Sequence, residues 1–107
     1  MVTGDDPVKG VDILKEYIVH THAKDGRRLF VKDPEVVYGL ISEENVTDSS
    51  FIELPLGEGD VPFPEWIKAL DAIGYNGFLT IEREVGENPY QDIAQAVTFL
   101  QNHIKNY

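Results

Sequence analysis

Apolar residues recur at helical spacing in three parts of the chain, and each part begins with residues that favour a helix start. Asp6-Pro7 opens a short helix, Pro64 opens a second that ends before Gly74, and Asn88-Pro89 opens the last. Gln91 completes a variant of the capping box at the start of the last helix. The apolar positions are Val8, Val11 and Leu14 in the first helix, Trp66, Ile67, Leu70 and Ile73 in the second, and Ile93, Val97, Leu100 and Ile104 in the third.

Two segments rich in β-branched and aromatic residues predict strands between these helices. They are Tyr17–Ala23, ended by Asp25-Gly26, and Gly77–Glu84. Residues 27–50 predict an irregular insert, in which 28–31 and 36–41 are either short strands or loop, and 42–50 is polar and exposed. Strands that alternate with helices are typical of an α/β fold with a parallel sheet, so we expect a single domain over residues 1–107.

Two parallel strands cannot form a complete sheet, because parallel sheets are covered on both faces and each free edge exposes unpaired backbone groups. The chain is therefore expected to be a piece of something larger, or to complete its sheet with another copy of itself as a homo-oligomer. An open sheet of this kind is not expected to behave as a stable monomer.

Composition excludes several classes of protein. The 107 residues include 9 Lys+Arg and 19 Asp+Glu, so the net charge is 9 − 19 = −10 with neutral histidines, which argues against a nucleic-acid partner. The chain has no cysteine, and hence no disulfide or thiolate site. No apolar run is long enough for a membrane span and the N-terminus carries no secretory pattern, so we expect a cytoplasmic protein without a membrane partner.

Alternation along the two strands brings polar residues to one face. Ile18, His20, His22 and Lys24 share a face of the first strand, as Phe78, Thr80, Glu82 and Glu84 do on the second. The polar positions lie toward the carboxyl ends, where α/β folds place their active sites. Imidazole and carboxylate ligands together suit a divalent ion such as Mn²⁺, Mg²⁺, Co²⁺ or Zn²⁺. The alternatives are ordinary histidines, a solvated edge strand, and a surface ion pair between Lys24 and Asp25.

The Gly-Glu-Gly sequence at 57–59 allows two interpretations. Glycines let backbone N–H groups approach an anion, so the loop could cradle a phosphate. The lysine and hydroxyl of a P-loop are missing, however, and a tight turn into the Pro64 helix is the default.

Three blocks of the sequence resemble the sugar phosphate isomerase/epimerase family, the xylose isomerase-like TIM barrels. Residues 17–25 (YIVHTHAKD) resemble its seventh strand, 54–63 (LPLGEGDVPF) the loop that follows, and 70–84 (LDAIGYNGFLTIERE) the seventh helix and eighth strand. The resemblance implies the C-terminal fragment of a (β/α)8 barrel, from the sixth helix to the eighth, completed by oligomerisation.

The resemblance also implies site residues. Catalytic members hold one divalent metal with two Glu, one Asp and one His, of which His22 and Glu82 match this chain. Glu82 would also be one of two carboxylates that exchange a proton beside a sugar carbonyl, through an enediolate that the metal stabilises. Arg28 is the nearest match to a substrate-contacting arginine, and His20, Lys24 and Glu84 are further candidates for substrate contact.

This implies a sugar or sugar-phosphate substrate in the parent barrel. The isolated chain lacks half of the metal ligands, so we expect it to be inactive by itself and to hold a metal weakly or not at all. The main alternative is a self-assembling structural or interaction fragment without catalysis. A barrel-family endonuclease or a lyase on the same scaffold are weaker alternatives, since fold does not fix reaction.

Overall fold

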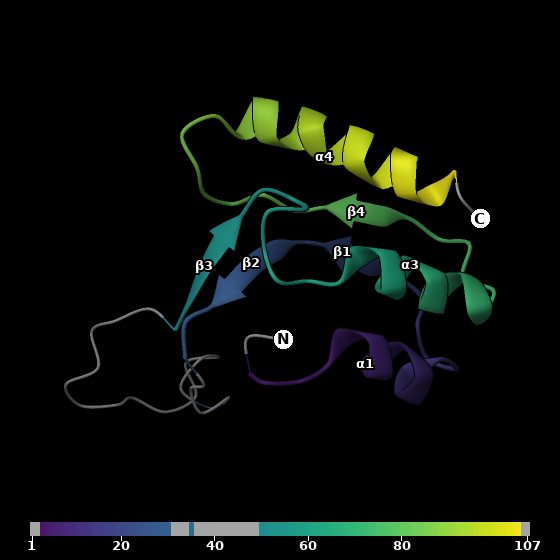
Figure 1. Ribbon diagram of the computed structural model, residues 1–107. Helices are drawn as coiled ribbons and strands as arrows, with labels where there is room; N and C mark the ends of the chain where they lie inside the picture. The colour runs from purple at the N-terminus through teal and green to yellow at the C-terminus, as the bar shows by residue number, and fades with distance from the viewer. Residues whose placement is uncertain (1–2, 31–34, 36–49, 106–107) are drawn as a thin grey trace.

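A computed structural model describes residues 3–30, 35 and 50–105. The element order is α1 (Pro7–Leu14), β1 (Thr21–Ala23), β2 (Asp25–Arg28), β3 (Phe51–Leu54), α3 (Phe63–Ala72), β4 (Leu79–Ile81) and α4 (Pro89–Ile104) (Figure 1). The α/β order confirms the predicted alternation of helices and strands.

The helix ends follow the predicted capping residues. The Asp6 carboxylate accepts a hydrogen bond from the backbone N–H of Val8 at 2.8 Å, and Pro7 occupies the first turn of α1. The Asn88 side chain caps α4 by accepting from the N–H of Gln91 at 3.1 Å. Gly74 follows α3 with φ 73°, the left-handed conformation that a helix terminus of this kind favours.

The two predicted strands pair in parallel, as expected, but they are shorter than predicted. Thr21, His22 and Ala23 lie opposite Leu79, Thr80 and Ile81. The flanking residues that we assigned to strands lie outside this ladder, because the described chain offers β1 and β4 no further pairing partner. Tyr17 instead closes a turn after α1 by donating its N–H to the Leu14 carbonyl.

A second sheet corrects the expectation for residues 25–28. Asp25-Gly26 does not end the chain's extended segment but begins β2, which pairs antiparallel with β3 from Asp25 opposite Leu54 to Arg28 opposite Phe51. The insert expected from residue 27 therefore begins with ordered strand. In the possible strand at 28–31, Arg28 ends β2, and Leu29 and Phe30 donate their N–H groups to the Ser50 carbonyl. The possible strand at 36–41 lies outside the described residues. Ser50, in the segment 42–50 that we predicted as exposed, is buried.

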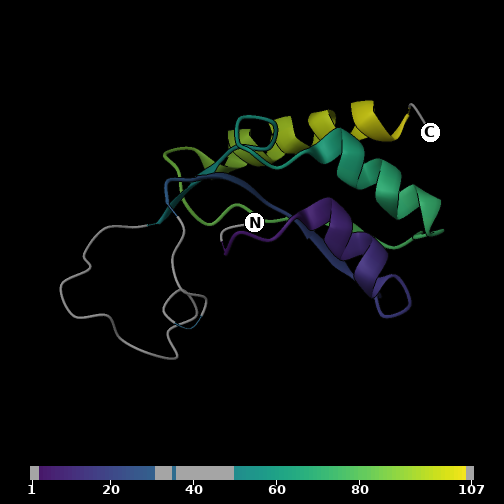
Figure 2. The same ribbon diagram turned by 60° about the horizontal axis from the view of Figure 1, so that its bottom comes forward.

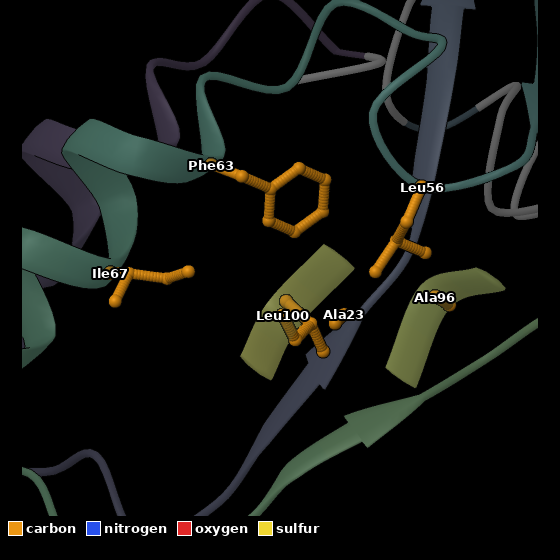
Figure 3. Close-up of a cluster of buried hydrophobic side chains, with 6 residues drawn as sticks. All are labelled: Ala23, Leu56, Phe63, Ile67, Ala96 and Leu100. Atoms are coloured by element: carbon orange, nitrogen blue, oxygen red, sulfur yellow. The ribbon is translucent and has the colours of Figure 1, made fainter. Parts of the chain in front are cut away.

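The core lies between β1–β4 and the helices (Figure 3). Phe63 and Ile67 of α3 meet Ala96 and Leu100 of α4 over Ala23 of β1, with Leu56 from the connecting loop. Trp66 packs against this cluster with its ring edge-on to Phe63, which confirms its predicted place in the core. Figure 2 shows α3 between α1 and α4, and α3 contacts both.

The predicted apolar stripe of α4 is only partly buried. Leu100 is buried, but Ile93, Val97 and Ile104 are each at least 40% exposed, and Ala96 takes their place in the core. The stripe thus extends beyond the surface that the described elements cover.

Large apolar side chains are also exposed beside the short sheet, including Val19 at 88% and Phe78 at 79%. Within the described segments, β1 and β4 pair only with each other, so each retains one open edge. No helix among the described residues is long and apolar enough to cross a membrane.

Candidate metal and substrate face

The face of β1–β4 that is turned away from the core carries the predicted histidines and carboxylate. His22 Nδ1 lies 3.0 Å from Glu82 Oε2, and His20 Nε2 lies 3.1 Å from the hydroxyl of Thr80. The two imidazole rings meet edge-on with centroids 5.1 Å apart. Parallel pairing explains the cluster, because His22 is opposite Thr80 and Glu82 follows two residues later on the same face.

Lys24 joins this face through three carboxylates. Its Nζ lies 3.0 Å from Glu53 Oε1, 3.2 Å from Glu84 Oε1 and 3.3 Å from Glu82 Oε1. The alternative of a surface pair between Lys24 and Asp25 is therefore wrong. Lys24 and Glu84, which we predicted as substrate-contacting residues, lie within this cluster beside Glu82.

Glu53 on β3 is the buried centre of the ionic network. One of its oxygens binds Lys24, and the other accepts from Arg83 Nη1 at 3.0 Å and from the backbone N–H of Val85 at 3.0 Å. Arg83 also binds Asp92 of α4 at 2.8 Å. Charge-assisted hydrogen bonds of this kind connect β1, β3, β4 and α4, and they hold the end of β4 in place.

The network shifts the ionisation of its members. Hydrogen bonds to the Glu84 carboxyl, to His22 and to Lys24 lower the pKa of Glu82 to about 2. Partial burial by itself would raise the pKa of Glu53, but bonds from Lys24 and the backbone N–H groups of Val85 and Glu84 outweigh it and lower that pKa. The pKa of Lys24 is raised despite its partial burial, because three carboxylates bind the ammonium.

Asp25, the first residue of β2, binds the loop that carries the Gly-Glu-Gly sequence and not the residues of this face. Its carboxylate is buried and accepts from the backbone N–H groups of Gly57 (2.9 Å), Gly59 (3.1 Å) and Val61 (3.1 Å), and from its neighbour Gly26 (2.8 Å). The loop is a tight turn into α3, as expected by default, but it is shaped around an anion that the chain itself supplies.

Arg28 also lies away from His22 and Glu82. It lines a hollow of about 370 Å³ near the N-terminus. The other residues of this hollow are Gly4, Asp5, Asp6, Pro7, Asp60 and Pro62. The structure therefore does not bring Arg28 together with the other predicted site residues.

The donor atoms of His22 and Glu82 suit a shared divalent ion. Ligands bound to one ion at about 2.1 Å lie about 3 Å apart when they are adjacent, which matches the spacing of these two atoms. Among the residues that the structure describes, no group of three His, Cys, Asp or Glu side chains is arranged to hold a metal, so this pair is not part of a larger set there.

Comparison with known families matches residues 1–103 to the family described as Xylose isomerase-like TIM barrel. The chain belongs to this family. This family match confirms the predicted fold class, in which β1 and β4 are neighbouring strands of a partial barrel. The family includes sugar isomerases or epimerases as well as endonucleases.

One solved structure similar to this chain is a xylose isomerase domain protein from Planctomyces limnophilus. It shares 30% sequence identity with a TM-score of 0.72, over 98% of this chain and 34% of that protein. The chain thus spans about a third of the length of this relative. No curated protein matches the sequence.

Sequence reasoning missed Glu53 and the role of Arg83. Glu53 is a single charge within the otherwise apolar segment 51–56, and a buried charge in such a segment needs a partner. That pattern could have marked it as buried and paired, but its partners are about 30 residues away in the chain.

Proposed function

We propose that the chain is the C-terminal part of a metal-dependent sugar isomerase or epimerase, and that it contributes His22 and Glu82 to the metal. The observation that carries this proposal is the 3.0 Å spacing of His22 Nδ1 and Glu82 Oε2 on one face of neighbouring parallel strands. Barrel enzymes place their active sites at this end of the strands. Membership of the family supports the same assignment at a coarser level.

The ionisation of Glu82 supports a ligand role. With a pKa of about 2, its carboxylate carries a full negative charge at neutral pH and can hold a cation together with neutral His22. A bound divalent ion would polarise a sugar carbonyl and stabilise the enediolate. For Glu82 to accept a proton as well, its bonds to Lys24 and Glu84 would have to loosen, since such a low pKa makes a weak base.

Substrate contact is proposed for His20, Lys24 and Glu84, which flank the metal pair. Lys24 remains an ammonium at neutral pH and donates hydrogen bonds, so it suits a hydroxyl or carbonyl oxygen of a sugar. Arg28 has no role in this proposal, because it lies in the hollow near the N-terminus.

Two protein ligands leave the metal site incomplete, so the proposal includes a partner. The open edges of β1 and β4 and the exposed apolar side chains beside them suit further strands and helices of a barrel, from another copy or from another polypeptide. The second candidate function is a self-assembling module without catalysis, and it is supported by these open strand edges alone.

Metal content measured on an assembly of known mass separates the two candidates. We would determine the mass of the chain by light scattering at several concentrations, in Mn²⁺, and measure the metal in the same chromatographic peak. The first candidate predicts about one Mn²⁺ per complete site. It also predicts that His22→Ala and Glu82→Gln each reduce the Mn²⁺ content at least tenfold without changing the mass.

His103→Ala is the matched control, since His103 lies on α4 and its Nδ1 binds the Phe99 carbonyl at 2.8 Å. It should leave the metal content unchanged. An assembly that stays metal-free at saturating Mn²⁺ would contradict the enzyme proposal and favour the self-assembling module.

A further inference from the structure

The turn that connects α3 to β4 contains an asparagine followed by a glycine, Asn76-Gly77 (Figure 1). Such a pair cyclises more readily than other asparagine sequences, because no side chain beside the glycine nitrogen hinders its approach to the asparagine side chain. The product is a five-membered succinimide ring. In a folded protein the reaction depends on how far the surrounding structure holds the two groups.

Both reacting groups of this pair are open to solvent. Asn76 and Gly77 are exposed. Among the described residues, neither the Asn76 side chain nor the Gly77 N–H has a hydrogen-bond partner. Exposed turns with few bonds open at a small free energy, so the Gly77 nitrogen can reach the side-chain carbonyl carbon, Cγ, of Asn76.

The contacts of the turn favour glycine at position 77. A Cβ at Gly77 would meet the hydroxyl and the ring of Tyr75. That hydroxyl donates to the Phe78 carbonyl at 2.8 Å, and the Thr21 hydroxyl donates to the same carbonyl at 2.9 Å. A larger residue at position 77 would therefore displace Tyr75 from the carbonyl that precedes β4, so the packing retains the residue that makes Asn76 reactive.

A second pair with the same chemistry, Asp25-Gly26, has the opposite surroundings. Aspartate followed by glycine forms the same ring with loss of water. The Asp25 side chain is buried and accepts from four backbone N–H groups, one of which is the Gly26 N–H. Both residues also pair with β3. This pair should react only when the strand opens, so the fold distinguishes two sites that the sequence presents as similar.

We propose that Asn76 is a site of spontaneous deamidation and isoaspartate formation. The Gly77 nitrogen loses its proton to a solvent base and bonds to Cγ of Asn76, and the Cγ–Nδ2 bond breaks with release of ammonia. Water then opens the succinimide at either of its two carbonyls, which leaves aspartate or isoaspartate at this position. The overall reaction consumes one water, releases one ammonia and needs no oxidant or reductant. It does not depend on the proposed enzyme function.

The two products should differ in their effect on the fold. Aspartate changes only an exposed side chain. In isoaspartate the main chain runs through the former side chain, which adds one methylene to the turn. The longer turn moves the Phe78 carbonyl away from the hydroxyls of Tyr75 and Thr21, which fix the start of β4 beside β1. Isoaspartate therefore loosens the strand pair that brings His22 and Glu82 together.

Peptide mapping by mass spectrometry tests the inference. The folded chain and the chain unfolded in guanidinium chloride are incubated at the same mildly alkaline pH, and the peptides that contain positions 25 and 76 are followed with time. We expect Asn76 to convert at a similar rate in both samples, within a factor of about three, whereas folding slows the reaction at Asp25 by at least about tenfold. Protection of Asn76 as strong as that of Asp25 would overturn the inference.

Asn88 is the internal control, because it precedes Pro89, whose nitrogen carries no proton, and it should stay unconverted. Asn76→Gln is the control variant, since its side chain is one methylene too long for a five-membered ring. It should accumulate no product at position 76. Conversion of this variant at the rate of the unaltered chain would contradict the succinimide route.

The effect on the fold has a measurement of its own. Asn76→Asp should melt at the temperature of the unaltered chain, whereas the isoaspartate form, isolated by chromatography, should melt a few degrees lower. Equal melting temperatures would overturn the effect on the β1–β4 pair. Loss of the proposed metal site would leave all these readouts unchanged, so failure of the enzyme proposal and failure of this inference are distinguishable.

Discussion

Asp25 and Glu82 are carboxylates on adjoining parts of the fold, but their surroundings differ. Asp25 is buried, and its carboxylate accepts from the backbone N–H groups of the neighbouring Gly26 and of the distant loop 57–61. The Glu82 side chain is 31% exposed, and its partners are the side chains of His22, Lys24 and Glu84. A carboxylate held by main chain cannot leave without disturbing the loop, whereas one held by side chains can exchange them for a metal or a substrate.

The backbone partners of Asp25 give it a structural role, whereas the side-chain partners of Glu82 are compatible with the ligand role proposed for it. Glu53 is intermediate, since it is as buried as a structural group but binds both Lys24 and Arg83. It fixes the position of Lys24, and Lys24 in turn contacts Glu82. Substitutions at these carboxylates should therefore differ in their effect on stability.

The largest effect is expected for Asp25→Ala. Removing the acceptor of four buried N–H groups should lower the free energy of unfolding by about 3 kcal/mol, since an unsatisfied buried donor costs about 1–3 kcal/mol and the loop can relax around some of them. Urea denaturation measures this difference. Glu58→Ala, an exposed position in the same loop, should change stability by less than about 0.5 kcal/mol. Equal effects of the two substitutions would contradict the structural role of Asp25.

Glu53→Gln should have a smaller effect, about 2 kcal/mol, because it weakens charge-assisted bonds while Lys24 and Arg83 keep other carboxylate partners. Denaturation in urea at neutral pH measures this loss. Glu87→Gln, an exposed position after β4, is the matched control for removal of one negative charge. If the two variants are equally stable, Glu53 is not the centre of the network.

The smallest effect on stability is expected for Glu82, and acid should reveal it. Its pKa falls from about 4.5 to about 2 on folding, so its contribution is present above pH 4.5 and is lost as the pH falls through 2. Glu53, whose pKa is also lowered, acts in the same direction. The melting temperature of Glu82→Gln should therefore decrease less between pH 5 and pH 2 than that of the unaltered chain. Parallel pH profiles would contradict the low pKa of Glu82.

Local sequence patterns predicted the helix starts well. Asp6-Pro7 and Asn88-Pro89 act within one helical turn, so their effect does not depend on distant residues. The lengths of β1 and β4 could not be predicted in this way, because a strand extends only as far as its partner. The burial of the apolar stripe on α4 could not be predicted for a related reason. Ile93, Val97 and Ile104 are apolar at helical spacing, but the described elements do not cover them.

The residues of the candidate site also differ in whether local sequence could predict their position. The sequence by itself determined that His20, His22 and Lys24 share one face of a strand and Glu82 and Glu84 one face of another, because alternation is a property of any extended chain. Only the tertiary structure decided that Glu53 meets Lys24 and that Asp25 binds the backbone N–H groups of the loop 57–61. Those contacts join residues about 30 or more positions apart, and their geometry depends on how β2, β3 and the loop before α3 pack together.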